Sequence, residues 1–89
     1  HRRFPLVFID EHHVYGNTLG DLKFAAKCQS PGDKIVLDDY SPGFPGVLKA
    51  VDVFMKTGVY SKSQIKLSES RSLAILQRKL DEESRASYQ

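Results

Sequence analysis

Acidic residues follow two short apolar segments of this chain, and their positions suit them for binding a ligand. Asp10 comes directly after residues 4–9, and Asp38 and Asp39 come directly after residues 34–37. If both segments are parallel strands of one sheet, their carboxyl ends lie at the same edge, which is where open α/β sheets bind ligands. The three carboxylates are then expected at one rim. The alternative is that these acids only cap helices or hold loops.

The elements expected around the first two acids alternate between strand and helix. Residues 4–9 form a continuous apolar run, which is typical of an inner strand covered on both faces. Thr18 is predicted as the N-cap of a helix that ends before a Ser-Pro-Gly-Asp turn at residues 30–33. Residues 34–37 predict the second strand, directly after that turn.

The second half of the chain predicts one more helix and a hairpin. Pro45 suits the first turn of a helix whose apolar stripe ends before Gly58. Residues 65–67 and 73–76 predict two antiparallel strands with a turn between them. The order of elements predicts a single α/β domain over residues 1–78, with a parallel strand–helix–strand–helix part followed by an antiparallel hairpin. Residues 79–89 are predicted as a polar tail.

Composition excludes several classes of function. The chain has 89 residues, enough for one core, and its 13 basic and 11 acidic residues give a net charge of only +2, so nucleic-acid binding is not expected. No apolar run reaches the length needed to cross a membrane, and no leader is seen, so no membrane partner is expected. A single cysteine, Cys28, cannot form an internal disulfide. A cytoplasmic location is therefore expected.

Several segments resemble, in order and spacing, the C-terminal half of a class I S-adenosylmethionine-dependent methyltransferase. The closest subgroup is the macrocin and catechol O-methyltransferase type. The resemblance implies a partial Rossmann-like sheet whose final hairpin corresponds to the family's sixth and seventh strands. It also implies metal-assisted O-methyl transfer from S-adenosylmethionine to the hydroxyl of a small-molecule acceptor. The matching segments are residues 7–15, 21–22, 31–40, 45–47 and 50–54.

The same resemblance implies roles for individual residues. Asp10, Asp38 and Asp39 fall where the family holds a magnesium ion, and Asp10 also falls at the cofactor. Magnesium prefers oxygen ligands and acts as a Lewis acid, which suits this set of carboxylates. His13 falls where the subgroup has its histidine, and an imidazole that titrates near neutral pH suits a general base. Alternatively, His12 and His13 are partly exposed loop residues.

Two departures from the family keep other functions open. The chain contains no Gly-x-Gly-x-x-Gly segment, so the family's cofactor loop is not among these residues, and Glu11 and His12 replace a Gly-Asp pair. The alternative function is a non-catalytic, truncated methyltransferase-like module that self-associates or binds a partner through an exposed edge strand. A nucleotide-linked α/β binding module with unrelated chemistry is a third class.

The family's strand order has a consequence for assembly. In the complete fold the family's first strand lies beside its fourth, so residues 6–9 become an unpaired hydrophobic edge in this chain. We therefore expect either a homo-oligomer or a missing N-terminal half of a longer protein.

Overall fold

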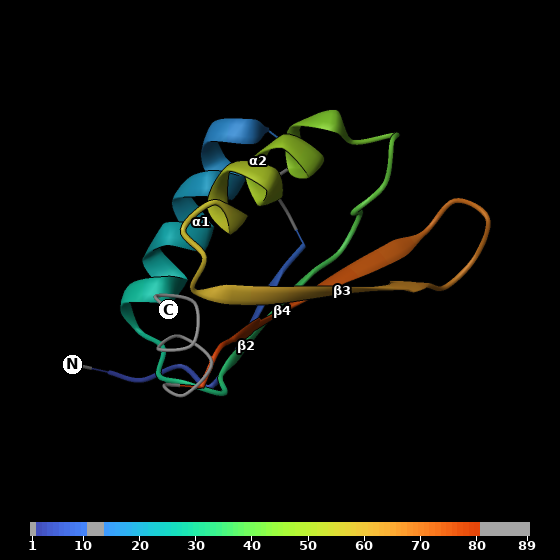
Figure 1. Ribbon diagram of the computed structural model, residues 1–89. Coiled ribbons are helices and arrows are strands. Elements are labelled where there is room, and N and C mark those ends of the chain that lie inside the picture. The colour runs from blue at the N-terminus through green and yellow to red at the C-terminus, as the bar shows by residue number, and fades with distance from the viewer. Residues whose placement is uncertain (1, 11–13, 81–89) are drawn as a thin grey trace.

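The computed structural model describes residues 2–10 and 14–80, which form a four-stranded mixed sheet with two helices on one side of it (Figure 1). The predicted α/β class and the predicted order of elements are confirmed. His13 and most of the predicted polar tail lie outside the described residues. The elements are β1 (Leu6–Ile9), α1 (Tyr15–Lys27), β2 (Lys34–Leu37), α2 (Pro45–Met55), β3 (Tyr60–Lys66) and β4 (Ser72–Arg78).

The strands lie in the order β1-β2-β4-β3. β1 and β2 are parallel, with Ile9 opposite Leu37, whereas β4 is antiparallel to both β2 and β3. Both the predicted parallel pair and the predicted antiparallel hairpin are thus confirmed.

β1 is an edge strand of this sheet. The continuous apolar run predicted an inner strand covered on both faces, and this is wrong within the described residues, because Leu6 and Phe8 are 65% and 54% exposed. The hydrophobic edge expected from the family's strand order is confirmed. The sequence pattern is that of an inner strand, but no described segment lies on the outer side of β1.

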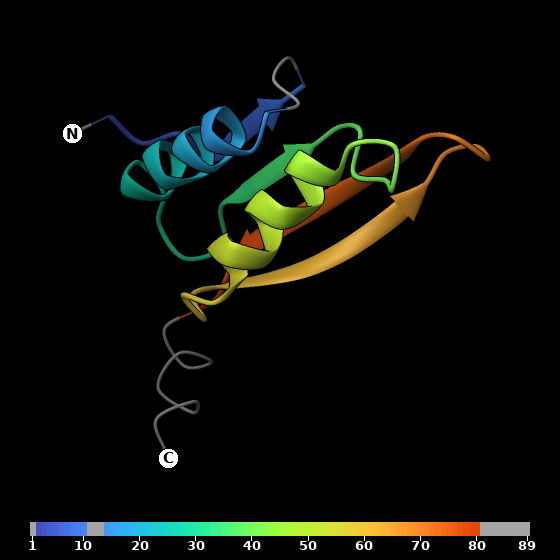
Figure 2. The same cartoon turned by 90° about the horizontal axis from the view of Figure 1, so that it is seen from above.

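The core lies between the sheet and the two helices. Side chains alternate between the faces of a strand, and the fully buried ones of β2 and β4 point toward the helices. The two helices contact each other, α1 beside β1 and α2 beside β3 (Figure 2). Neither is long and apolar enough to span a membrane. The most buried core residues are Leu22 and Ala25 of α1, Val47, Ala50, Val51 and Phe54 of α2, Ile35 and Leu37 of β2, Tyr60 of β3, and Ala74 and Leu76 of β4.

The helix boundaries agree with the sequence at one helix and differ at the other. α2 begins at Pro45 as predicted, and Gly58 follows its end with a φ of 74°, a conformation that glycine adopts easily. α1 begins at Tyr15, with Val14 as its N-cap, so the predicted N-cap at Thr18 is wrong. Thr18 is fully buried, and its N–H donates to the Val14 carbonyl at 3.0 Å, which places Thr18 inside the helix.

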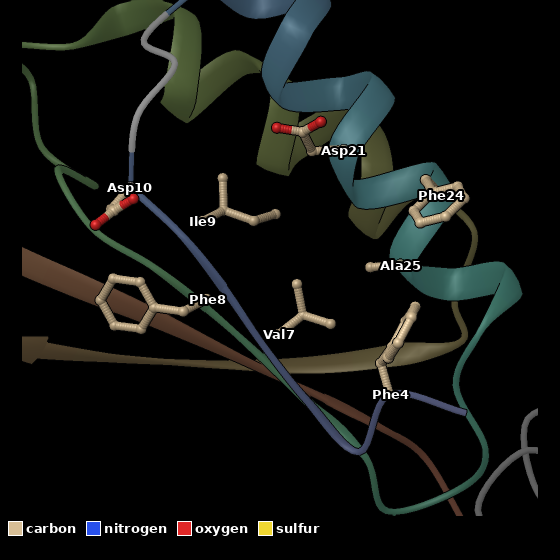
Figure 3. Close-up of a pocket in the computed structure, with 8 residues that line it drawn as sticks. All are labelled: Phe4, Val7, Phe8, Ile9, Asp10, Asp21, Phe24 and Ala25. Carbon is tan, nitrogen blue, oxygen red and sulfur yellow. The ribbon is translucent and has the colours of Figure 1, made fainter. Parts of the chain in front are cut away.

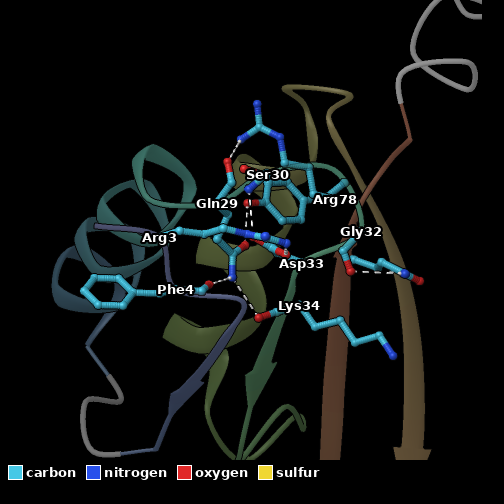
Figure 4. Close-up of polar contacts among 10 residues, drawn as sticks. Arg3, Phe4, Gln29, Ser30, Gly32, Asp33, Lys34 and Arg78 are labelled. Carbon is cyan, nitrogen blue, oxygen red and sulfur yellow. Dashed lines mark hydrogen bonds and ion pairs between the residues drawn. The ribbon is translucent and has the colours of Figure 1, made fainter. Parts of the chain in front are cut away.

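A buried amide joins the elements near the amino ends of β1 and β2 (Figure 4). The Gln29 side-chain nitrogen donates to the carbonyl oxygens of Phe4 at 3.0 Å and Lys34 at 2.8 Å. The Tyr60 hydroxyl donates to the Gln29 side-chain oxygen at 2.7 Å. This one side chain therefore ties together the start of β1, the start of β2 and the start of β3.

An ion pair strengthens the same end of the sheet. Arg3 donates to both carboxylate oxygens of Asp33, at 2.6 and 3.0 Å, and the Ser30 N–H donates to Asp33 at 2.8 Å. These bonds, led by the one from Arg3, lower the pKa of Asp33 to about 2. Asp33 lies at the end of the sheet opposite Asp10. Its role is structural.

Candidate functional site

β1 and β2 bring Asp10 and Asp38 to the same edge of the sheet. Ile9 pairs with Leu37 in parallel register, and the Asp38 N–H donates to the Ile9 carbonyl oxygen at 3.0 Å. The two acids therefore follow neighbouring strands whose backbones are about 5 Å apart. The ends of β1 and β2 thus lie at one edge of the sheet, as predicted, and Asp10 is exposed to solvent.

Asp38 is held by a residue that the sequence did not single out. Arg71, in the turn between β3 and β4, donates from Nε to Asp38 Oδ1 at 3.2 Å and from Nη2 to Asp38 Oδ2 at 2.9 Å. The hydrogen bond to Asp38 raises the pKa of Arg71. The Asp38 side chain is 13% exposed and that of Arg71 is 55% exposed, so the pair closes over the rim from the solvent side.

Asp39 turns the chain away from the sheet. Its φ is 58°, which makes it the one non-glycine residue with a positive φ in the described part of the chain. The Asp39 N–H donates to Asp38 Oδ1 at 2.8 Å, and the Asp39 carbonyl accepts from the Ser41 N–H at 3.0 Å. Because the backbone is left-handed at Asp39, the chain turns there, and the side chains of Asp38 and Asp39 point in different directions although the residues are adjacent in sequence.

These acids do not form a metal site on their own. Among residues 2–10 and 14–80, no group of three His, Cys, Asp or Glu side chains lies where it could hold a metal ion. Both oxygens of Asp38 are already bound by Arg71. His13, predicted as the base, lies outside the described residues. The ligand roles of Asp10, Asp38 and Asp39 and the role of His13 remain predictions.

A pocket of about 700 Å³ opens at this rim, between the loop after β2 and the turn of the hairpin. Asp39, Ser41 and Phe44 line it from the loop, and Arg71 lines it from the turn. The pocket combines an apolar ring, the carboxylates of Asp39 and Glu69 and a guanidinium, which is the mixture that orients a small polar ligand. This pocket lies beside the predicted acids, and Asp39 is the one of them that lines it.

A second hollow, a groove of about 420 Å³, runs along β1 on the side of α1. Figure 3 shows Val7 and Ile9 on the side of β1 that faces α1, and Phe8 on the opposite side. Phe24 of α1 lines the groove, and its side chain is 63% exposed. Asp10 lies at the end of the groove, so it borders both the groove and the rim.

Sequence reasoning missed Arg71 because nothing local marks it. It was assigned to a turn between two strands, and that assignment is correct. Its function depends on β4 pairing with β2, which puts Leu37 opposite Ala74 and carries the turn past the end of β2.

Three solved structures that superpose on this chain are described as methyltransferases. A methyltransferase from Pyrococcus furiosus superposes with a TM-score of 0.67 and 20% sequence identity, over 90% of this chain and 43% of that chain. The chain has part of a methyltransferase fold. No protein-family model matches the sequence, and no curated protein matches it.

Two further neighbours agree. A Clostridium thermocellum protein assigned as an rRNA methylase gives a TM-score of 0.63 at 14% identity, over 88% of this chain and 52% of that chain. The N-methyltransferase NodS from Bradyrhizobium japonicum WM9 gives 0.59 at 14% identity, over 90% and 53%. This chain thus spans about half the length, or less, of the three structures. At these identities the likeness is one of fold.

Proposed function

We propose that this chain is the C-terminal half of an S-adenosylmethionine-dependent methyltransferase that methylates a small-molecule hydroxyl. The observation that carries the proposal is the parallel pairing of β1 with β2, which puts Asp10 and Asp38 at one rim. Ligands bind at this edge in open α/β sheets, and the solved structures with this fold are methyltransferases. The resemblance of these segments to macrocin- and catechol-type sequences supports an oxygen acceptor.

The cofactor and the acceptor are assigned to two different regions of the rim. Asp10, exposed at the end of β1, is the acid placed to accept hydrogen bonds from the cofactor. The pocket of Asp39, Phe44 and Arg71 is the space for the acceptor. S-adenosylmethionine, when bound, supplies an electrophilic methyl group. The methyl–sulfur bond of the cofactor would break as the acceptor oxygen takes the methyl group, and the demethylated cofactor would leave. His13 is the proposed base for the proton of the acceptor hydroxyl.

We expect positioning and electrostatic stabilisation, rather than a covalent enzyme intermediate, to supply most of the rate enhancement. Arg71 fixes the Asp38 carboxylate with two hydrogen bonds, so the acid has one defined orientation at the rim. Phe44 supplies an apolar wall that excludes water from one side of the pocket. The described residues as they stand do not fit a magnesium site, because Arg71 binds both oxygens of Asp38. No step of the reaction is therefore assigned to the ion.

Calorimetric titration with S-adenosylmethionine, or with its demethylated product, tests the proposal. We expect saturable binding to the full chain, weakened at least about tenfold, or ~1.4 kcal/mol, by Asp10→Asn. Asp52→Asn removes an exposed acid from α2, away from the rim, and should bind as the parent does. Equal binding by Asp10→Asn and the parent would overturn the assignment of Asp10.

A second series of titrations, with and without magnesium, tests whether the ion takes part in binding and whether the chain is a non-catalytic module instead. If magnesium acts at this rim, it strengthens binding in the parent, and the effect is lost in Asp38→Asn but survives in Asp52→Asn. If the ion plays no part, magnesium changes neither. No heat with either ligand, with or without magnesium, would favour the non-catalytic module over the enzyme.

A further inference from the structure

The Asp38 carboxylate has partners on both of its oxygens. Oδ1 accepts hydrogen bonds from the Asp39 N–H at 2.8 Å and from Arg71 Nε at 3.2 Å, and Oδ2 accepts one from Arg71 Nη2 at 2.9 Å. A magnesium ion lies about 2 Å from each oxygen that it binds, so an ion on either oxygen would lie within about 5 Å of the Arg71 nitrogens. Two cations at that separation repel each other, and the ion must therefore displace Arg71 in order to bind.

The positive charge of Arg71 acts on two of the three acids for which a magnesium ion was predicted. The hydrogen bond to Asp38 raises the pKa of Arg71 most, and the charges of Asp38 and Asp39 raise it further. A guanidinium is planar, and two parallel N–H groups match a carboxylate better than a single point charge does. Arg71 thus provides these acids with a cation that belongs to the chain itself.

The same side chain borders the pocket assigned to the acceptor. Arg71 lines this pocket together with Phe44, Asp39 and Glu69. A guanidinium has five N–H groups in a rigid fork, and the two bonds to Asp38 leave three that Asp38 does not use. An oxygen of a ligand in the pocket can accept hydrogen bonds from these groups. Contact with an acceptor oxygen is what a bound ion would otherwise supply.

We propose that Arg71 takes the place of a divalent ion at this rim. Its guanidinium binds the two oxygens of Asp38 that an ion would need, and it supplies the positive charge beside the acceptor pocket. The parent chain then binds no magnesium through Asp38. The role of Arg71 toward the acceptor rests on the proposed function, whereas its hold on Asp38 does not.

The other two predicted ligands do not compensate for the loss of Asp38. The left-handed backbone at Asp39 turns its side chain away from that of Asp38. Asp10 is exposed at the end of β1. Magnesium requires a near-octahedral set of oxygens and releases its water reluctantly, so a single exposed carboxylate holds it weakly. Whether Asp38 is bound by Arg71 therefore decides whether these acids can hold an ion.

Removal of Arg71 should create an ion site that the parent lacks. Asp38 is then released beside Asp10, since the two follow paired strands, and two carboxylates with water are a ligand set that magnesium and manganese(II) use. We expect calorimetry to show magnesium binding at least about tenfold tighter in Arg71→Ala than in the parent. Manganese(II) should broaden the amide NMR signals of Ile9 and Asp38 selectively in the variant. A pair with only a structural role predicts no such gain.

Two further variants show whether the gained site is at Asp38. Adding Asp38→Asn to Arg71→Ala should remove the gain. Lys66→Ala is the matched control, because Lys66 lies in the same hairpin and pairs with Glu69 at 3.8 Å. It removes the same charge without releasing Asp38, and it should bind magnesium as the parent does.

The result that would overturn the proposal is a parent that binds magnesium as tightly as Arg71→Ala. Equal gains in Arg71→Ala and Lys66→Ala would also overturn it, because general charge rather than the hold on Asp38 would then explain them. Arg71 lies in an exposed turn, and circular dichroism shows that each variant is folded. These titrations contain no cofactor, so they can fail while S-adenosylmethionine still binds, and failure of the proposed function is recognised separately.

Discussion

Two arginine–aspartate pairs hold opposite ends of the sheet, and they differ in burial. Asp33 is buried and also accepts a bond from the Ser30 N–H, so its pair with Arg3 is fixed into the structure. Asp38 is less buried than Asp33, at 13% against 3% exposed, and it pairs with Arg71, which reaches in from a turn; the two arginines are similarly exposed, at 55% and 58%. The second pair sets the orientation of the Asp38 carboxylate at the rim.

Acid should weaken the fold through Asp33. Its pKa in the folded chain is about 2, below its usual value of 3.8, so its contribution to stability is complete above about pH 4 and is lost as the pH falls toward 2. Thermal unfolding followed from pH 6 to about pH 2 should show this loss in the parent, and a flatter acid limb in Asp33→Asn.

Asp52→Asn serves as the control for that series, since Asp52 is an exposed acid on α2. It should reproduce the parent's dependence on pH. If Asp33→Asn and the parent lose stability in parallel between pH 4 and 2, the bond from Arg3 does not stabilise the folded carboxylate as the structure requires.

The elements whose apolar residues repeat with a clear spacing were the ones that could be predicted from the sequence. β2 and α2 agree with their predicted bounds because their apolar residues repeat as a covered strand and an amphipathic helix require. β3 was recognised only near its end, since Tyr60 is buried and the six residues after it are exposed, which leaves no alternation to detect. Its pairing with β4, and not its own sequence, makes it a strand.

The candidate site was predictable to a similar extent. Asp10 and Asp38 were placed correctly because each directly follows a strand, and parallel pairing then fixes their position. Arg71 was not predictable from local pattern, because its contact with Asp38 spans 33 residues and depends on which strand β4 joins. Thr18 was misassigned because a threonine suits both an N-cap and a buried position in a helix, and packing decides between them.

Because the helices cover only one face of the sheet, truncating adjacent residues of β4 should lower the free energy of unfolding by different amounts. Leu76 is fully buried under the helices, and Leu76→Ala should lower the free energy of unfolding by about 2–5 kcal/mol. Ile75 points to the uncovered face, and Ile75→Ala should cost less than half as much. Urea unfolding of both variants makes the comparison, and equal costs would mean that the second face is covered as well.

A chain of 89 residues with one open sheet face gains only part of the burial that a layered α/β protein achieves. Small domains bury about 60% of the surface of their unfolded chain, so added burial at an interface matters to them.

The left-handed backbone at Asp39 has a practical use for anyone who dissects this rim. With a φ of 58°, the position tolerates glycine and asparagine but strains a valine or isoleucine. Asparagine retains both the shape and the backbone preference of aspartate while removing its charge. Asp39→Asn is thus a probe that isolates electrostatics from conformation, whereas an alanine scan at the same residue would mix the two.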